Sequence, residues 1–267
     1  MVWHTLEKTI HRTAEIDPKA ELGAGVKIGA FVVIEGGVEI GGGTEVHPHA
    51  VIRAGVKIGT DCKIYSGAVL GGEPQDVKFK GEESYLTIGN GTIIRECVTA
   101  HRGSGEGSVT KIGSGCMLMA TTHVAHNCIV GDKVTMANLA TLGGFSQVGD
   151  CAFVGGVSGL HQFVRVGAYV MVGGGSVLLE DVPPYMLVTG GHRPSVCGLN
   201  RIGLVRAGFS EEARRALHKA YRILYKQDLG VKEAVEKMKE ELADSKEVGV
   251  LIDFLETKTD RGISKGR

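Results

Sequence analysis

An aliphatic residue recurs at every sixth position of this chain from Ile10 to Leu178, with two interruptions. A helical period of about 3.6 residues drifts out of phase with such a repeat, and ordinary strand alternation does not single out one residue in six. A flat side of six residues that turns one aliphatic side chain inward does explain it. Three such sides close a triangular coil of 18 residues. The repeat therefore predicts a stack of coils.

A second restricted position lies four residues after each aliphatic one. It holds small or β-branched residues, such as Val26, Ala68, Val134 and Ser176. Glycine often follows the aliphatic residue, and the 41 glycines of the chain suit close corners. Such coils stack about 4.8 Å apart with parallel backbones, and each covers the edge of the one before. The chain is predicted to be mainly β, a parallel β-helix of hexapeptide repeats.

Charge and composition exclude several classes of protein. Lys and Arg together number 30, as do Asp and Glu, so there is no overall basic field for nucleic acid. No apolar run approaches the roughly 18 residues of a membrane-spanning helix. The N-terminal residues MVWHTLEKTIHR lack the apolar core of a secretion signal. We expect a cytoplasmic protein with no integral membrane segment and no nucleic-acid partner. Its six cysteines form no C-x-x-C pair and are expected to be buried thiols.

The repeat is interrupted at residues 72–87 and 101–111, which are polar and glycine-rich. We expect loops there, and loops on a rigid scaffold often carry binding groups. The repeat ends at Pro183 and Pro184, because proline cannot donate a ladder hydrogen bond. We expect a β-helical domain over residues 1–190 and an α-helical domain over residues 191–267.

The C-terminal region changes from the sixfold repeat to helical spacing. Residues 185–209 show no regular pattern. Ser210 is expected to cap the first of three helices. The residues after Asp260 are polar and basic and are expected to fray. The apolar stripes of the three helices lie within residues 213–224, 231–242 and 248–255.

One histidine can be placed by its spacing in the repeat. A residue 18 positions further along lies above its predecessor, so Gly144 is predicted to lie above His126. A glycine lets its backbone N–H approach a ligand closely. An imidazole that removes a proton from a hydroxyl, beside an N–H that stabilises an oxyanion, suits acyl transfer without a Ser or Cys nucleophile.

The other histidines leave alternatives open. His101, His123 and His126 could together bind zinc, although their spacing does not clearly bring the rings to one side of a coil. No metal is therefore expected. The remaining histidines without an apparent partner are expected to be structural or surface residues: His4, His47, His49 and His218.

Several longer strings are more specific than the repeat. They include Gln75-Asp76-Val77-Lys78, Arg95 to Gly103, His123-Val124-Ala125-His126, Leu160-His161-Gln162-Phe163, Asp181 to Tyr185, and Asn200 followed by Arg206 to Ser210. In this order the chain resembles the hexapeptide acyltransferases, and among them the UDP-N-acetylglucosamine O-acyltransferases that open lipid A biosynthesis. The resemblance covers nearly the whole chain.

The resemblance implies a left-handed prism and a homotrimer with active sites between neighbouring prisms. It implies transfer of an R-3-hydroxyacyl chain from acyl carrier protein to the 3-hydroxyl of UDP-N-acetylglucosamine, with the carrier-bound thioester as co-substrate and no cofactor. His126 would be the general base and Gly144 the oxyanion donor. The positions implied to bind substrate are Gln75, Asp76, Lys78, His101, His123, His161, Gln162, Gly174, His192, Asn200 and Arg206, with Gly174 at the ruler for the acyl chain.

The chain departs from that family at three positions. Asn127 follows His126 where many members have Asp, Phe145 replaces a His, and Ile202 replaces an acidic residue. An alternative acceptor is therefore the 3-amino analogue, a UDP-2,3-diamino sugar that would be N-acylated. The later N-acyltransferase of the pathway is less expected, because such enzymes usually carry an N-terminal domain and the repeat here begins near Ile10.

Other functional classes also stay open. A zinc-dependent hydratase and a non-catalytic β-helical scaffold are the alternatives outside acyl transfer. A cluster of basic residues could bind an acidic carrier protein or could be a solvated helix face. These residues are Arg201, Arg206, Arg214, Arg215, Lys219 and Arg222.

Overall fold

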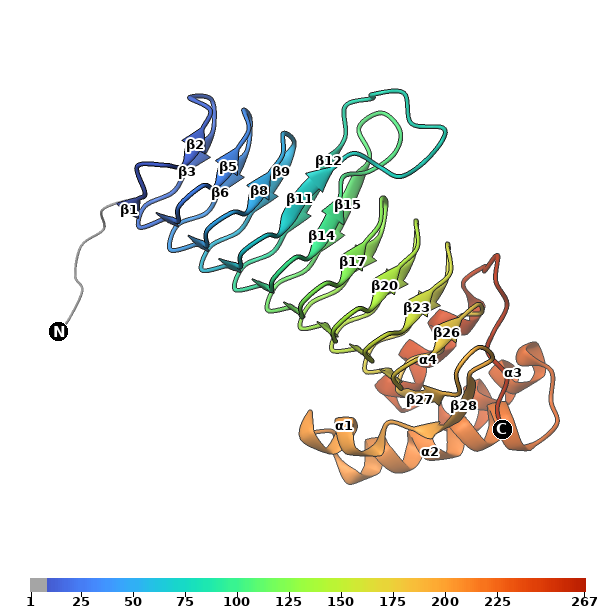
Figure 1. Ribbon diagram of the computed structural model, residues 1–267. Coiled ribbons are helices and arrows are strands. Elements are labelled where there is room, and N and C mark those ends of the chain that lie inside the picture. Colours follow the sequence, from blue (N-terminus) through green and yellow to red (C-terminus); the bar gives the residue numbers. More distant parts are fainter. Residues whose placement is uncertain (1–8) are drawn as a thin grey trace.

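The computed structural model describes residues 9–267 and consists of a long prism of short strands followed by helices (Figure 1). Residues 1–8 lie outside the described range. They include His4 and most of the N-terminal segment that was expected to lack a secretion signal. Nearly every coil contributes one strand to each of three sheets, so strands three apart in the chain are neighbours. The expected β-helix is confirmed.

The three sheets that residues 9–267 form are numbered 1, 2 and 3 in the order in which the chain first enters them. Sheet 1 has 11 strands: β1 (Thr9–Ile10), β4 (Lys27–Ile28), β7 (Glu45–Val46), β10 (Lys63–Ile64), β13 (Ile93–Ile94), β16 (Met117–Leu118), β19 (Thr135–Met136), β22 (Phe153–Val154), β25 (Met171–Val172), β27 (Met186–Thr189) and β28 (Ser195–Leu199). Sheet 2 has 9 strands: β2 (Glu15–Ile16), β5 (Val33–Ile34), β8 (Val51–Ile52), β11 (Val69–Gly72), β14 (Thr99–His101), β17 (His123–Val124), β20 (Thr141–Leu142), β23 (Gly159–Leu160) and β26 (Val177–Leu178). Sheet 3 has 8 strands: β3 (Glu21–Leu22), β6 (Glu39–Ile40), β9 (Val56–Ile58), β12 (Tyr85–Ile88), β15 (Val109–Ile112), β18 (Ile129–Val130), β21 (Gln147–Val148) and β24 (Arg165–Val166).

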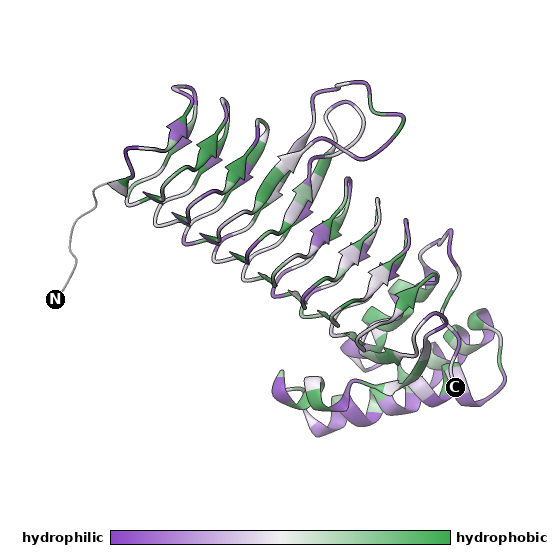
Figure 2. Cartoon of the chain, viewed as in Figure 1, coloured by the Kyte–Doolittle hydropathy of each residue, from purple (hydrophilic) through white to green (hydrophobic). Residues whose placement is uncertain are grey.

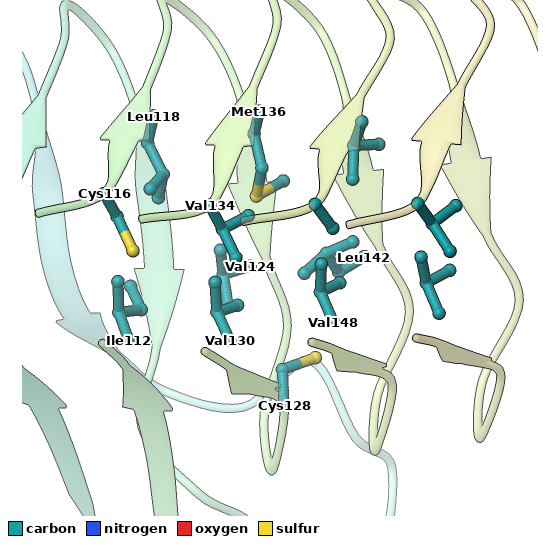
Figure 3. Close-up of a cluster of buried hydrophobic side chains, with 14 of the residues drawn as sticks. Ile112, Cys116, Leu118, Val124, Cys128, Val130, Val134, Met136, Leu142 and Val148 are labelled. Carbon is teal, nitrogen blue, oxygen red and sulfur yellow. The ribbon is translucent and has the colours of Figure 1, made fainter. Parts of the chain in front are cut away.

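Up to β26, the register of the sheets is the predicted step of 18 residues, except at the coils that carry the two loops, where the step is 30 or 24 residues. Val124 lies beside Leu142 in sheet 2, and Val130 lies beside Val148 in sheet 3. These side chains are buried, and Figure 3 shows them packed with the small residues of the second restricted position along the prism axis. Every coil therefore presents the same corner at the same place. We call the corners 1–2, 2–3 and 3–1 after the sheets that they join.

Cysteine burial follows position in the coil. Cys62, Cys116 and Cys128 are buried in the core, and burial raises the pKa of the Cys128 thiol to about 12. The expectation of buried thiols is wrong for Cys97, which is exposed, and holds only partly for Cys151 and Cys197, which are intermediate. Cys97 and Cys151 have left-handed backbone angles, with φ of 56° and 57°, and lie at corners rather than at inward positions.

The two interruptions are shorter than the sequence suggests. Strand β12 begins at Tyr85 and strand β15 at Val109, because Leu86 and Thr110 turn into the core. The true excursions are residues 73–84, the first loop, and residues 102–108, the second loop. Both leave the prism at the 2–3 corner, and they lie side by side, with the Gly107 N–H donating to the Glu83 carbonyl (Figure 1).

The expectation that residues 185–209 are irregular is wrong. Strand β27 follows the two prolines and continues sheet 1 beside β25, and β28 turns back antiparallel to it. Helix α1 (Arg201–Arg206) follows and is capped by Asn200, whose side chain accepts from the Gly203 N–H. The β27–β28 pairing crosses residue 190, and a domain boundary at that residue stays a prediction.

The three C-terminal helices follow the expected stripes. They are α2 (Glu211–Lys226), α3 (Val231–Leu242) and α4 (Lys246–Glu256), and Ser210 caps α2 as predicted. The hydropathy colouring shows hydrophilic residues along much of α2 (Figure 2). No described helix is long and apolar enough to cross a membrane.

The segment after α4 is fixed to the prism and does not fray as expected. Ile263 forms a bridge with Asp181, Gly266 forms one with Val196, and Ser264 is buried. Asp181 is fully buried and pairs with Arg165, with 2.7 Å between Oδ2 and Nε. The Arg165 guanidinium also lies over the Phe254 ring and donates to carbonyls at the end of α4. This ion pair joins the prism, the helices and the C-terminal segment.

We expect Asp181→Asn to lower the free energy of unfolding by about 3 kcal/mol, because it leaves the largely buried Arg165 without its counter-ion. The midpoint of chemical denaturation measures this. Glu39→Gln is the matched control, since it breaks an exposed pair with Lys57 and should cost less than about 1 kcal/mol. Equal losses in the two variants would contradict a stabilising role for the Arg165–Asp181 pair.

Candidate active site

His126 lies in the turn between β17 and β18, at the 2–3 corner, and only 7% of its surface is exposed. Gly144 occupies the corresponding turn of the next coil. A Cβ atom on Gly144 would lie 2.7 Å from both Cε1 and Nε2 of the ring. The imidazole edge therefore occupies space that is free only because residue 144 is glycine, and the predicted stacking of these two residues is confirmed.

The backbone N–H groups around Gly144 differ in their partners. The Gly143 N–H donates to the Leu160 carbonyl, and the Phe145 N–H donates to the His126 carbonyl. Within residues 9–267 the Gly144 N–H donates to no protein acceptor. A glycine that lies against an imidazole and has an unpaired N–H offers the two groups that acyl transfer to a hydroxyl would use.

Asn127 fixes the orientation and the tautomer of His126. The Ser104 N–H donates to Asn127 Oδ1 at 2.9 Å, and Asn127 Nδ2 donates to the Ser104 carbonyl, so the amide orientation is settled. His126 Nδ1 lies 2.8 Å from the same Oδ1, which can only accept. The neutral ring therefore carries its proton on Nδ1 and its lone pair on Nε2, which lies on the side of the ring next to Gly144.

Asn127 holds this position through a strained backbone. Its φ is 60°, in the left-handed region that Asn tolerates better than most residues, and its N–H donates to Thr110 Oγ1 at 2.8 Å. An amide oxygen thus orients the imidazole where many family members were expected to use a carboxylate. The sequence revealed the substitution but not this contact, which depends on the second loop.

Asp76 reaches the same corner from the first loop. Its Oδ2 accepts from Ser104 Oγ at 2.8 Å, and its Oδ1 accepts from the Lys78 N–H at 3.0 Å. These two hydrogen bonds lower the pKa of the Asp76 carboxyl. Gln75 and Lys78, the neighbours expected to bind substrate, have exposed side chains.

The rings of His101 and His123 pack against each other near His126. Their rings meet edge to face with centroids 4.8 Å apart, and His123 Nδ1 lies 2.7 Å from Thr99 Oγ1. His101 is buried, and its Nδ1 has no partner among the described residues. Burial, with additions from His123 and His126, lowers the pKa of His101 to about 4. Burial also lowers the pKa of His123, so both rings are neutral near pH 7.

The low pKa of His101 predicts acid sensitivity. Unfolded histidine titrates near 6.5, so below that pH the unfolded chain binds a proton that folded His101 refuses. Stability is complete above pH 6.5 and falls as the pH drops toward 4. We expect His101→Asn to lose less stability between pH 7 and pH 5 than the unaltered protein, measured by thermal unfolding. His161→Asn removes an exposed ring and should keep the original dependence, and a His101→Asn variant with that same dependence would contradict the assignment.

The zinc alternative finds no support in the arrangement of these rings. His123 Nδ1 and His126 Nδ1 are occupied by Thr99 and Asn127. No three His, Cys, Asp or Glu side chains of the described chain are grouped so that they could bind a metal ion.

Beyond Gly144, the 2–3 corner carries both polar and aromatic residues. Gln162 follows Gly144 by one coil, and His161 beside it is exposed. Phe145 stacks on Phe163, with ring centroids 4.9 Å apart, and meets His126 edge to face. Arg261 of the C-terminal segment donates from Nε to the Gln162 carbonyl at 2.7 Å. Sequence reasoning missed Arg261, because the segment that carries it was expected to fray.

Four expected substrate-binding residues lie away from His126 in the same chain. Gly174 is at the 1–2 corner, and His192 is in the exposed connection between β27 and β28. Asn200 donates from Nδ2 to the Tyr169 carbonyl at the 3–1 corner, and Arg206 is in the last turn of α1. One chain therefore does not gather all the expected positions into one site.

A basic groove of about 660 Å³ lies between α1 and α2. Arg201, Arg214, Arg222 and His218 line it without a salt bridge in the described chain, and Arg215 pairs with Glu211. Lys219 also lines it and pairs with Glu241. Arg206, expected in the same cluster, does not line the groove.

Two family models match this chain. The model described as UDP N-acetylglucosamine O-acyltransferase, domain 2, matches residues 181–264, and that of the bacterial transferase hexapeptide matches residues 19–54, 37–72 and 110–144. The acyl-[acyl-carrier-protein]–UDP-N-acetylglucosamine O-acyltransferase of Thiobacillus denitrificans is 45% identical over 96% of this chain and 98% of its own length. The enzyme of the same name from Thermodesulfovibrio yellowstonii is 46% identical over 96% of this chain and 99% of its own length.

Solved structures agree with these relatives. LpxA from Acinetobacter baumannii is 41% identical, with a TM-score of 0.92 over 96% of this chain and 99% of that one. LpxA from Bacteroides fragilis, a UDP-N-acetylglucosamine acyltransferase, is 39% identical, with a TM-score of 0.93. The match covers 96% of this chain and 100% of that one.

Proposed function

The chain belongs to the acyl-[acyl-carrier-protein]–UDP-N-acetylglucosamine O-acyltransferases of lipid A biosynthesis, and from this premise we propose its reaction and the residues that perform it. The substrates are an R-3-hydroxyacyl thioester of acyl carrier protein and the 3-hydroxyl of UDP-N-acetylglucosamine. The observation that carries the proposal is the close approach of the His126 ring to Gly144, whose N–H has no acceptor among residues 9–267. We expect the protein to act in the cytoplasm.

The proposed reaction has two proton transfers at one nitrogen. His126 Nε2 removes the proton of the 3-hydroxyl while that oxygen attacks the thioester carbonyl carbon. The Gly144 N–H donates to the oxyanion of the tetrahedral intermediate. The carbon–sulfur bond then breaks, and the leaving thiolate takes the proton back from Nε2. Asn127 Oδ1 accepts from Nδ1–H throughout and keeps the ring in place.

The separation of the expected residues supports a trimer. His126, Gly144 and Gln162 share the 2–3 corner, whereas Gly174 lies at the 1–2 corner and Asn200 at the 3–1 corner. Parallel prisms packed around an axis would bring different corners of neighbouring copies together. We propose that a second copy supplies the nucleotide-binding residues His192, Asn200 and Arg206, and that Gly174 borders the acyl chain.

The basic groove supports docking of the carrier protein. An acidic partner gains orientation and association rate from unpaired cations, even on a protein without net charge. Arg201, Arg214 and Arg222 provide such cations at the helical end of the prism.

One observation favours a second acceptor, the 3-amino analogue of the sugar nucleotide. Asn127 is neutral, so the imidazolium formed at His126 has no carboxylate as its hydrogen-bond partner. An amine needs less help than a hydroxyl, because it attacks as a neutral nucleophile and loses its proton afterwards. The diamino sugar is therefore the second candidate acceptor.

The purified protein tests both candidates. R-3-hydroxyacyl carrier proteins of different lengths are incubated with either sugar nucleotide, and the acylated products are identified by mass spectrometry. We expect the higher kcat/KM with UDP-N-acetylglucosamine. A higher value with the amine would favour the second candidate, and no acylation of either acceptor would contradict the proposed reaction.

A further inference from the structure

Ser104 contacts both Asn127, which orients the His126 ring, and Asp76, which reaches the same corner from the first loop. It lies in the second loop, half-buried, two residues before the turn at Glu106. Its backbone N–H and carbonyl pair with the Asn127 amide, and its hydroxyl donates to the Asp76 carboxylate. One residue therefore connects the first loop, the second loop and the turn that carries His126.

The backbone and the side chain of Ser104 have separable tasks. The pairing with Asn127 uses main-chain atoms, so it survives any substitution that keeps the backbone N–H and conformation. The contact with Asp76 uses only the hydroxyl. Removing the hydroxyl should therefore leave the His126 tautomer unchanged and alter only the position of the Asp76 carboxylate.

Asp76 depends on that hydroxyl for its position relative to His126. Its other hydrogen bond comes from the Lys78 N–H, within its own loop, and so does not locate the carboxylate against the prism. The two loops also touch where the Gly107 N–H meets the Glu83 carbonyl and where Arg102 lies over the Phe79 ring. Neither of these contacts involves the carboxylate, so Ser104 Oγ is the inter-loop partner of Asp76 itself.

We propose that Ser104 is a positioning residue for the acceptor sugar, whose hydroxyl holds Asp76 at the distance from His126 that a bound sugar requires. The inference rests on the proposed function, in which Asp76 binds the sugar and His126 removes its proton. A hydrogen bond to a charged group is stronger than one between neutral groups, so the Ser104 hydroxyl restrains the Asp76 carboxylate against thermal motion of its loop.

Ser104→Ala tests the proposal by separating KM from kcat. We expect the KM for UDP-N-acetylglucosamine to rise about tenfold, which corresponds to about 1.4 kcal/mol of lost acceptor binding. The kcat should fall less than about threefold and the acidic limb of its pH profile should not move, because the Asn127 pairing persists. Ser104→Thr keeps a hydroxyl and should restore the KM.

Ser108→Ala is the matched control in the same loop. Its hydroxyl donates to the Gly105 carbonyl and touches neither Asp76 nor Asn127, so its removal should leave both constants within about twofold. A double-mutant cycle completes the test. If Ser104 acts through Asp76, Asp76→Asn should remove most of the effect of Ser104→Ala, so that the two changes are not additive.

Three results would overturn the inference while the unaltered enzyme still turns over. The first is a KM and kcat of Ser104→Ala that equal those of Ser108→Ala. The second is a fall in kcat by Ser104→Ala as large as its loss of acceptor binding. The third is an effect of Ser104→Ala on the KM that simply adds to that of Asp76→Asn. Absence of turnover by the unaltered enzyme would instead overturn the proposed function, so the two failures are distinguishable.

Discussion

His126→Ala should lower kcat about a thousandfold while the fold and the assembly stay intact. The substitution removes the Nε2 lone pair that takes the acceptor proton, and general base catalysis commonly contributes 10²–10⁴-fold. The residual rate should come from the Gly144 N–H and from substrate binding. Steady-state kinetics with saturating acyl donor and acceptor measure the loss, and circular dichroism with size-exclusion chromatography checks the fold and the assembly.

His49→Ala is the matched control for that variant. His49 is exposed at an early corner, where it stacks on Phe31 with ring centroids 5.2 Å apart. We expect the activity of this variant to stay within about twofold of the unaltered enzyme. Near-normal turnover by His126→Ala would remove this imidazole from the reaction and would leave the proposed function without its base.

Gly144→Ala should be nearly as damaging, although it adds only one methyl group. The new Cβ would lie 2.7 Å from the His126 ring, closer than carbon and nitrogen atoms can approach, so the ring must move. The same methyl group crowds the N–H that would meet the oxyanion, and loss of one such donor costs 10²–10³-fold. We expect kcat/KM to fall at least a hundredfold, with both the base and the donor displaced.

Gly249→Ala separates this effect from the general consequence of replacing glycine. Gly249 lies in α4, where a Cβ would meet no atom within 4 Å, so alanine should be neutral or slightly stabilising there. Activity should not change. A Gly144→Ala enzyme that keeps most of its activity would show that the space above His126 is not used in the reaction.

The sixfold repeat was sufficient to predict the prism, its register and the stacking of Gly144 on His126. These follow from covalent spacing alone, because a coil of fixed length returns each residue to the same corner. The three later helices followed from apolar stripes and the cap at Ser210 for a similar reason. Each of these features is local or strictly periodic, and so is visible in a single sequence.

The features that escaped prediction depend on contacts between distant segments. Strand β28 is ordered by pairing with β27, and the segment after α4 is ordered by Asp181 and Val196. The contact of Ser104 with Asp76 likewise joins two loops whose paths no periodicity describes. Polarity alone suggested disorder for the C-terminal segment, because the burial of Ser264 and the hydrogen bond from Arg261 to Gln162 have no signature in their own neighbourhood.

The coil register places an unusual limit on how such a chain can change its length. His126 and Gly144 meet because one complete coil separates them, as in the pairing of Ile129 with Gln147. Insertion or deletion of a single residue between them would turn inward side chains outward and would carry the glycine off the imidazole. Gains and losses of residues should therefore accumulate in the two excursions at 73–84 and 102–108, or come in whole coils. The reaction centre would then be preserved by a constant number of residues between His126 and Gly144, even where most side chains of the prism are free to vary.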